Sequence, residues 1–145
     1  MERVTAAVEQ AHGRQLHFVL TARAENFLHG RADLDDTVKR LQAFERAGAD
    51  VLFAPGLPDL AAVRTVCSAL KKPVNFMVGM RGKSFTVAEL AAAGVRRISL
   101  STSLYRAAMT GLLAAAHEVS ERGTFSYVDD IVSGGELGKY LRPPQ

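Results

Sequence analysis

The stretch LHFVLTARAEN, residues 16–26, is the most informative about the fold. It begins as an apolar run suited to a buried strand, and it ends in an arginine, a glutamate and an asparagine. Because side chains alternate along a strand, two faces can be separated. One face becomes polar toward the carboxyl end of the run and carries His17, Val19, Thr21 and Arg23. The other face is apolar and carries Phe18, Leu20 and Ala22.

Three more β-rich runs follow the first one. The four runs are HFVLT (17–21), VLFA (51–54), VNFMV (74–78) and RISL (97–100). Each is followed by a segment with helical periodicity; these are LDDTVKRLQAFERAG, DLAAVRTVCSALKK, TVAELAAAG and SLYRAAMTGLLAAAHEVSERG. A capping box of Thr86 and Glu89 begins the third helix, and glycines 48, 94 and 123 are expected to end helices. This alternation predicts an α/β fold of four βα units with a parallel sheet.

Two architectures fit this order of elements. One is an open, doubly wound sheet, and the other is a (βα)8 barrel of the TIM type, which needs about 250 residues. With 145 residues, the chain would then form half of a barrel. We expect a single half-barrel domain over residues 1–145, with residues 125–145 as a C-terminal arm.

The composition excludes several classes of protein. The net charge is +3 and the basic residues are scattered, which argues against nucleic-acid binding. The single cysteine, Cys67, excludes an internal disulfide and a cysteine-based zinc site, and we expect it to pack in the core. The N-terminal segment is not typical of a signal peptide, and no apolar run approaches the length of about 20 residues that spans a membrane. A cytoplasmic protein without a membrane partner is expected.

Polar residues gather where the strands are predicted to end, which is where parallel βα folds bind ligands. Arg23 stands at such an end, and its planar guanidinium suits a carboxylate or a phosphate. Asn75, Ser99 and Ser101 fall on the corresponding face of later strands. Structural roles remain open, because Arg23 and Glu25 could pair with each other and Asn75 could cap a turn. No catalytic triad or metal-ligand spacing stands out.

Several phrases, in their order and spacing, resemble the C-terminal half of the isocitrate lyase/phosphoenolpyruvate mutase superfamily. They are FVLTARAEN, DDTVKRLQAFERAGADVLFAPGL, KPVNFMV, TVAELAAAGVRRISLSTSLYRAA and the late GTF. The likeness is greatest to the branch of 2-methylisocitrate lyases, oxaloacetate decarboxylases and carboxyphosphonoenolpyruvate phosphonomutase-like proteins. It implies a (βα)8 barrel that uses Mg²⁺ and makes or breaks C–C or P–C bonds next to an enolate.

The resemblance also implies roles for individual residues. Arg23 would grip a substrate carboxylate or phosphonate, Glu25 would orient the arginine or the substrate, and Asn75 would contact the substrate. Ser99 and Ser101 would complete the polar rim. The implied function is part of a Mg²⁺-dependent carbon–carbon lyase acting on a short α-hydroxy or α-keto di- or tricarboxylate. The alternatives are a P–C bond mutase or hydrolase, and an inactive half-barrel that serves as a binding or assembly module.

The resemblance covers only part of the superfamily's barrel. The superfamily's metal-binding acidic residues and mobile catalytic loop belong to strands one to four, so we expect the catalytic residues and the Mg²⁺ ligands to be absent from this chain. Open strand edges invite pairing with another chain. We therefore expect a homo-oligomer, or pairing with a complementary half barrel, and a small carboxylate or phosphonate as ligand.

Overall fold

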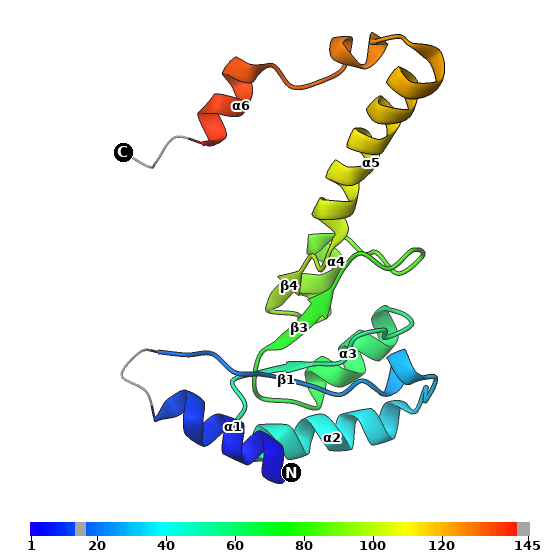
Figure 1. The fold of residues 1–145 in the computed structure, drawn as a ribbon. Coiled ribbons are helices and arrows are strands. Elements are labelled where there is room, and N and C mark those ends of the chain that lie inside the picture. Colours follow the sequence, from blue (N-terminus) through cyan, green and yellow to red (C-terminus); the bar gives the residue numbers. More distant parts are fainter. Residues whose placement is uncertain (14–16, 142–145) are drawn as a thin grey trace. The chain divides into compact units, whose positions relative to one another are not determined.

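The computed structural model describes residues 1–13 and 17–141 and divides the chain into two compact units, Met1–Ser103 and Leu104–Gln145 (Figure 1). The first unit contains α1 (Glu2–His12), β1 (Thr21–Arg23), a 3-10 turn (Asn26–His29), α2 (Leu34–Arg46), β2 (Val51–Phe53), α3 (Leu60–Ser68), β3 (Val74–Met77), α4 (Val87–Ala92) and β4 (Arg97–Ser99). Helix α5 (Ser103–His117) begins at Ser103, the last residue of the first unit, and continues into the second unit. The second unit continues with a π-helical turn (Glu118–Arg122), a 3-10 turn (Ser126–Asp129) and α6 (Gly134–Tyr140).

The four strands form one parallel sheet in the order β1-β2-β3-β4, which confirms the predicted α/β class and the βα units. Each strand is short, and β2, β3 and β4 each pair with the strand that precedes them in the chain. Among the described residues, β1 and β4 each have a partner on one side only.

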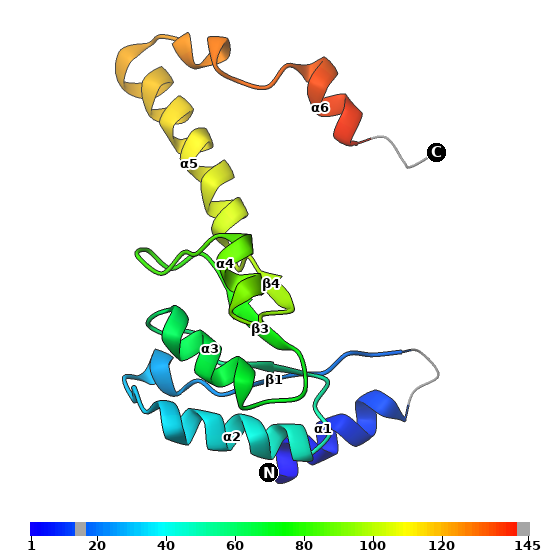
Figure 2. The same ribbon diagram turned by 180° about the vertical axis from the view of Figure 1, so that it is seen from behind.

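The core of the first unit lies between one face of the sheet and its helices (Figure 2). The strands contribute alternate residues, including Ala22, Leu52 and Val74, and the helices contribute Leu41 and Val63 among others. Leu41, Leu52 and Val63 have no exposed surface. Complete burial of one such side chain is worth about 1.5–3 kcal/mol, so this face of the sheet is the main source of stability.

The helix termini follow the sequence signals closely. The Asp33 carboxylate accepts the backbone N–H of Asp36 at the start of α2 at 2.8 Å, and the capping box of Thr86 and Glu89 is present at the start of α4. These bonds satisfy backbone donors that the first helical turn leaves free.

The prediction was wrong about where the first strand lies. It placed a strand at residues 17–21, whereas β1 covers Thr21–Arg23 and His17, Phe18 and Val19 are exposed. The reason is the position of the partner strand. The backbone N–H of Val51, the first residue of β2, donates to the Leu20 carbonyl. In this register residues 17–19 extend past the end of β2, so they face no residue of that strand. Helix α1 was missed altogether, although Val4, Ala7 and Ala11 give it a helical apolar spacing.

Cys67 packs in the first unit as expected. Cys67 packs against the buried cluster. A Cβ placed on Gly94 would lie 2.9 Å from the Cys67 Cβ, so the two residues are in close contact. Burial raises the pKa of the Cys67 thiol, with the Arg96 charge acting in the opposite direction. A thiol held in its neutral form by burial suits packing rather than nucleophilic chemistry.

The second unit is helical and has no buried residue between Leu104 and Leu141. The predicted arm at residues 125–145 contains the 3-10 turn and α6, while residues 142–145 lie outside the described part of the chain. Over residues 1–13 and 17–141, no helix has both the length and the apolar character required to cross a bilayer.

Candidate functional site

A row of four side chains crosses the sheet on the face opposite the helix-covered core. The strand registers pair Arg23 with Phe53, Phe53 with Asn75, and Asn75 with Arg97. Paired positions on neighbouring parallel strands place their side chains on the same face. The row therefore brings together two predicted site residues, Arg23 and Asn75, and adds Phe53 and Arg97.

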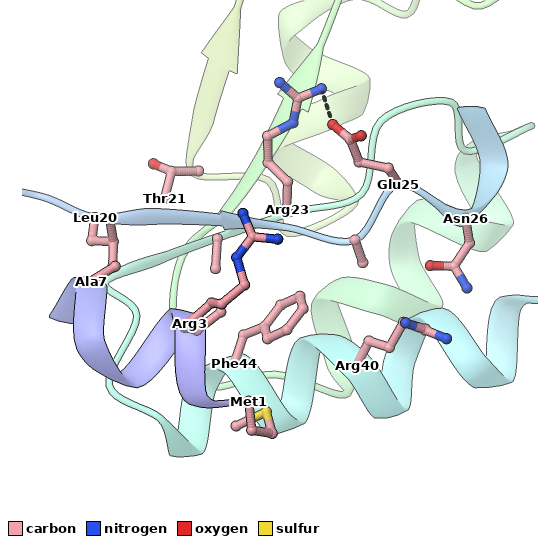
Figure 3. Close-up of a pocket in the computed structure, with 13 residues that line it drawn as sticks. Met1, Arg3, Ala7, Leu20, Thr21, Arg23, Glu25, Asn26, Arg40 and Phe44 are labelled. Carbon is pink, nitrogen blue, oxygen red and sulfur yellow. Dashed lines mark ion pairs between the residues drawn. The ribbon is translucent and has the colours of Figure 1, made fainter. Parts of the chain in front are cut away.

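Arg23 is held by two contacts at the carboxyl end of β1. Its Nη2 lies 2.8 Å from Oε1 of Glu25, and its guanidinium carbon lies 5.2 Å from the centroid of the Phe53 ring. The Arg23 and Glu25 side chains remain 47% and 40% exposed, so the pair is accessible to a ligand (Figure 3). An ion pair this exposed contributes only about 0–1 kcal/mol to stability, which makes orientation of the arginine its main effect. The predicted pairing of the two residues is thus present, and it leaves Arg23 available.

Asn75 is the most buried polar residue of the row, with 2% of its surface exposed. Its Nδ2 donates to Ser99 Oγ at 3.0 Å, and its Oδ1 accepts from Arg97 Nη1 at 3.2 Å. Asn75 therefore bridges β3 to β4 and does not cap a turn. Arg97 was missed by the sequence analysis, although the alternation that selects Ser99 also places Arg97, two residues earlier, on the same face.

The two predicted serines differ in position. Ser99 lies on β4 and is hydrogen-bonded to Asn75. Ser101 follows the strand in an exposed turn with φ at 50°, the only non-glycine residue with a positive φ in the described part of the chain. No hydrogen bond links Ser101 to the row among the described residues.

The loops that follow the strands contact one another in sequence. A Cβ added to Gly56, in the loop after β2, would lie 3.2 Å from the Phe27 Cβ in the loop after β1. The carbonyl of Gly56 accepts a hydrogen bond from Lys83 Nζ, in the loop after β3, at 3.1 Å. A Cβ on Gly79, in the same loop as Lys83, would lie 3.3 Å from the Ser103 Cβ. We call this chain of contacts, from Phe27 through Gly56 and Lys83 to Gly79 and Ser103, the loop rim.

A cleft of about 610 Å³ runs along the open edge of β1. Three arginines line it, Arg3 from α1, Arg23 from β1 and Arg40 from α2, with Phe44 among its apolar residues. Figure 3 shows Arg23 and Glu25 on one side of β1 and Phe44 and Arg40 on the other. The cleft therefore follows the strand edge and is not centred on the row. It combines positive charge with a strand edge that has no partner among the residues that the structure describes.

One carboxylate compensates part of that charge. A hydrogen bond from Arg40 holds the pKa of Asp36 below its ordinary value, with burial opposing the shift and the Asn26 amide adding to it. Arg40 Nε lies 2.7 Å from the Asp36 carboxylate, so Arg40 is engaged in an ion pair. No ion pair among the described residues involves Arg3 or Arg97.

The Mg²⁺ implied by the resemblance finds no site in this part of the chain. Over residues 1–13 and 17–141, no group of three His, Cys, Asp or Glu side chains is arranged to hold a metal ion. Glu25, the acidic residue beside Arg23, is paired with Arg23 and lies 3.4 Å from His29 Nε2. The described residues thus bring arginine side chains together but form no metal cradle.

Comparison with known proteins identifies the family. The sequence model of the phosphoenolpyruvate phosphomutase family matches residues 1–120, and the chain belongs to this family, within the isocitrate lyase/PEP mutase superfamily of lyases and phosphonomutases. The 2-methylisocitrate lyase of Escherichia coli is 28% identical over 140 residues, which cover 94% of this chain and 46% of that protein.

Solved structures agree with this assignment. A Burkholderia cenocepacia protein provisionally described as a lyase/mutase is 44% identical, with a TM-score of 0.91 over 99% of this chain and 52% of the other. Phosphonopyruvate hydrolase in complex with oxalate and Mg²⁺ is 26% identical, with a TM-score of 0.74 over 96% of this chain and 50% of the other. The chain thus spans about half the length of these relatives. Its four-stranded sheet matches part of a TIM-type barrel, which confirms the predicted fold class.

Proposed function

We propose that this chain forms the anion-binding part of a lyase active site that acts on a short α-hydroxy or α-keto di- or tricarboxylate. The observation that carries the proposal is that Arg23 is both held in one orientation and accessible. It stands at the carboxyl end of β1, is oriented by Glu25 at 2.8 Å, and stays about half exposed. A guanidinium held in one orientation suits bidentate contact with a carboxylate.

The reaction class explains why cations are useful here. Cleaving a C–C bond next to a carbonyl leaves negative charge on an enolate, and fixed positive groups stabilise such charge as it develops. In this proposal Arg23 binds the substrate carboxylate, Glu25 keeps Arg23 in place, and Ser99 lines the polar face. Ser101 lies farther out, in the turn after β4. A bound Mg²⁺ neutralises enolate charge, and we assign no step of it to the described residues because they form no site for it.

A phosphonate substrate is the second candidate. The structure of phosphonopyruvate hydrolase supports it, because that protein, named for a phosphonate substrate, is 26% identical and superimposes on 96% of this chain. A guanidinium binds phosphonate oxygens as well as carboxylate oxygens, so Arg23 suits either ligand. Under this alternative the site acts on a P–C bond and the role of Arg23 is unchanged.

We also propose that the chain works in association with another sheet or another copy. Among the described residues, one edge of β1 has no partner strand, and it lies beside a cleft lined by Arg3, Arg23 and Arg40. Unpaired parallel edges are templates for a further strand. The partner could be a complementary half barrel or a second copy of this chain.

The experiment that tests the function is thermal unfolding of the purified chain with oxalate or phosphonoacetate, each with and without Mg²⁺. A ligand that binds only the folded state raises the midpoint, by about 2.7 kcal/mol of stabilisation at one hundred times its Kd. Stabilisation by oxalate that the Arg23→Met variant loses would support an anion site at Arg23, but it would not separate the two candidates, because phosphonopyruvate hydrolase is also found in complex with oxalate. Preference for phosphonoacetate would favour the second candidate.

Two outcomes would contradict the proposal. If neither anion shifts the midpoint, the chain does not form an anion site by itself. The alternative of an inactive half-barrel that serves as a binding or assembly module would then describe it better. If both anions stabilise Arg23→Met as much as the unaltered chain, Arg23 does not bind them. Arg64→Met provides the control, since Arg64 is an exposed arginine on α3, outside the row and the cleft.

A further inference from the structure

Both polar atoms of the Asn75 amide have a partner within the sheet. Its oxygen accepts from Arg97 and its nitrogen donates to Ser99, and only 2% of the residue is exposed. The two bonds also fix which way the amide faces, because Arg97 can only donate and so must meet the oxygen. A ligand on this face of the sheet would therefore meet the neighbours of Asn75 before the amide itself.

Arg97 differs from Asn75 in two respects. It is exposed, and none of the ion pairs among the described residues includes it. Arg23, at the other end of the row, has part of its charge compensated by Glu25 at 2.8 Å. Arg97 thus carries the uncompensated guanidinium of the row, with one N–H directed to a neutral acceptor.

We propose that Asn75 is a positioning residue that holds the Arg97 guanidinium toward an oxyanion, and that Arg97, and not Asn75, makes the contact with the ligand. The proposal deepens the proposed function and rests on it. The ligand class is a carboxylate or phosphonate group, both of which present oxygens that accept from a guanidinium.

The identity of the residue at position 75 is what makes this arrangement useful. The neutral oxygen of an asparagine orients Arg97 while leaving its charge free for a ligand. An aspartate at the same position would orient Arg97 equally well and would neutralise it. The two side chains have nearly the same shape, so exchanging them separates positioning from charge.

The test measures binding of oxalate and of phosphonoacetate by calorimetry to the full chain and to four variants. Arg97→Met should weaken binding about tenfold to a hundredfold, the worth of a charge-assisted hydrogen bond. Asn75→Asp should weaken binding to a similar extent, because its carboxylate occupies the guanidinium. Asn75→Leu should weaken binding less, and should have no further effect in the Arg97→Met background, since its action passes through Arg97. Arg96→Met is the matched control, because it removes the same charge one residue earlier, off the row.

Several results would overturn the inference. If Arg97→Met binds normally while Asn75→Leu does not, Asn75 is the contact residue. If Arg96→Met weakens binding as much as Arg97→Met, only net charge is being measured. Additive effects of Asn75→Leu and Arg97→Met would show that the two residues act separately. If the unaltered chain binds neither anion, the proposed function and the contact role of Arg97 both fail. Positioning by Asn75 is then decided by urea unfolding, where an absence of coupling between the two substitutions would refute it.

Discussion

The two units of the chain use similar apolar residues to different effect. The first unit buries residues such as Leu41, Leu52 and Val63 completely between a sheet and its helices. The second unit buries none between Leu104 and Leu141. Its large apolar side chains are exposed, including Leu112, Leu113, Phe125, Ile131 and Val132. Helical periodicity is therefore enough to form α5, but it does not provide a surface that covers the apolar face of that helix.

The contrast between the two units would fail if replacing a buried leucine and an exposed leucine by alanine lowered the free energy of unfolding by the same amount. We expect Leu41→Ala in the first unit to lower the free energy of unfolding by about 2–5 kcal/mol, through lost burial and a cavity. Leu112→Ala, with a side chain that is exposed, should change it by less than about 0.5 kcal/mol in dilute solution. Urea unfolding followed by circular dichroism measures both. Equal effects would mean that the second unit has a core of its own.

Besides the edge of β1, the exposed apolar surface of α5 is a second place where copies of the chain should associate. Replacing both Leu112 and Leu113 by glutamate should weaken self-association more than tenfold, because apolar contacts at the centre of an interface carry most of its energy. Light scattering over a dilution series measures the effect, and Thr110→Glu on the same helix is the control for charge. A chain that is monomeric at every concentration before any substitution would contradict this prediction.

One carboxylate, that of Glu118, should stabilise the turn at residues 124–127 of the second unit. Glu118 accepts from Thr124 Oγ1 at 2.8 Å and from the Ser126 N–H at 2.6 Å. These hydrogen bonds, led by that of Thr124, hold the pKa of Glu118 below its ordinary value near 4.5. A depressed folded pKa gives stability that is present above the ordinary pKa and is lost as the pH falls through the lowered one.

At neutral pH, Glu118→Gln should therefore speed amide exchange at Ser126 and Tyr127, and the difference from the unaltered chain should shrink below pH 4.5, the ordinary value. Hydrogen exchange measured at matched pH gives the comparison. Glu121→Gln, an exposed residue in the same turn, is the control. A difference that persists unchanged into acid would show that the charge of Glu118 is not responsible.

The smallest effect on stability is expected at the loop rim of the first unit. This rim is held by hydrogen bonds and close contacts and not by a buried apolar core. Lys83→Met removes the hydrogen bond to the Gly56 carbonyl, which is worth about 0.5–1.5 kcal/mol. Trypsin should then cleave after the exposed Arg81 severalfold faster, as measured by mass spectrometry of the released fragments. Lys139→Met is the control. An unchanged rate would mean that Lys83 does not restrain this loop.

Much of the first unit could be predicted from local signals, and the errors have a common cause. Thr86 with Glu89 located the start of α4, and the apolar runs located β2, β3 and β4, because caps and alternation act over a few residues. The start of β1 was misplaced because it depends on where β2 begins, about thirty residues later. Strand register is a property of two segments and cannot be read from either one.

The candidate site shows the same limit. Arg23 was found because a charge at the end of an apolar run is conspicuous in the sequence. Arg97 was missed because it follows another arginine and precedes an apolar residue, so it resembles the solvated start of a strand. Its alignment with Asn75 follows from the register of β3 and β4, and its uncompensated charge becomes visible only when the surrounding carboxylates are placed.

The order of the strands has a consequence for how the chain is made. The strands β2, β3 and β4 each pair with the strand before them in the sequence. Synthesis proceeds from the N-terminus, and domains generally fold as the chain emerges. When a strand of this sheet leaves the ribosome, its partner has already been synthesised, so the sheet can lengthen one strand at a time. Among the four described strands, β1 is synthesised first, and β2, β3 and β4 are added to it in that order.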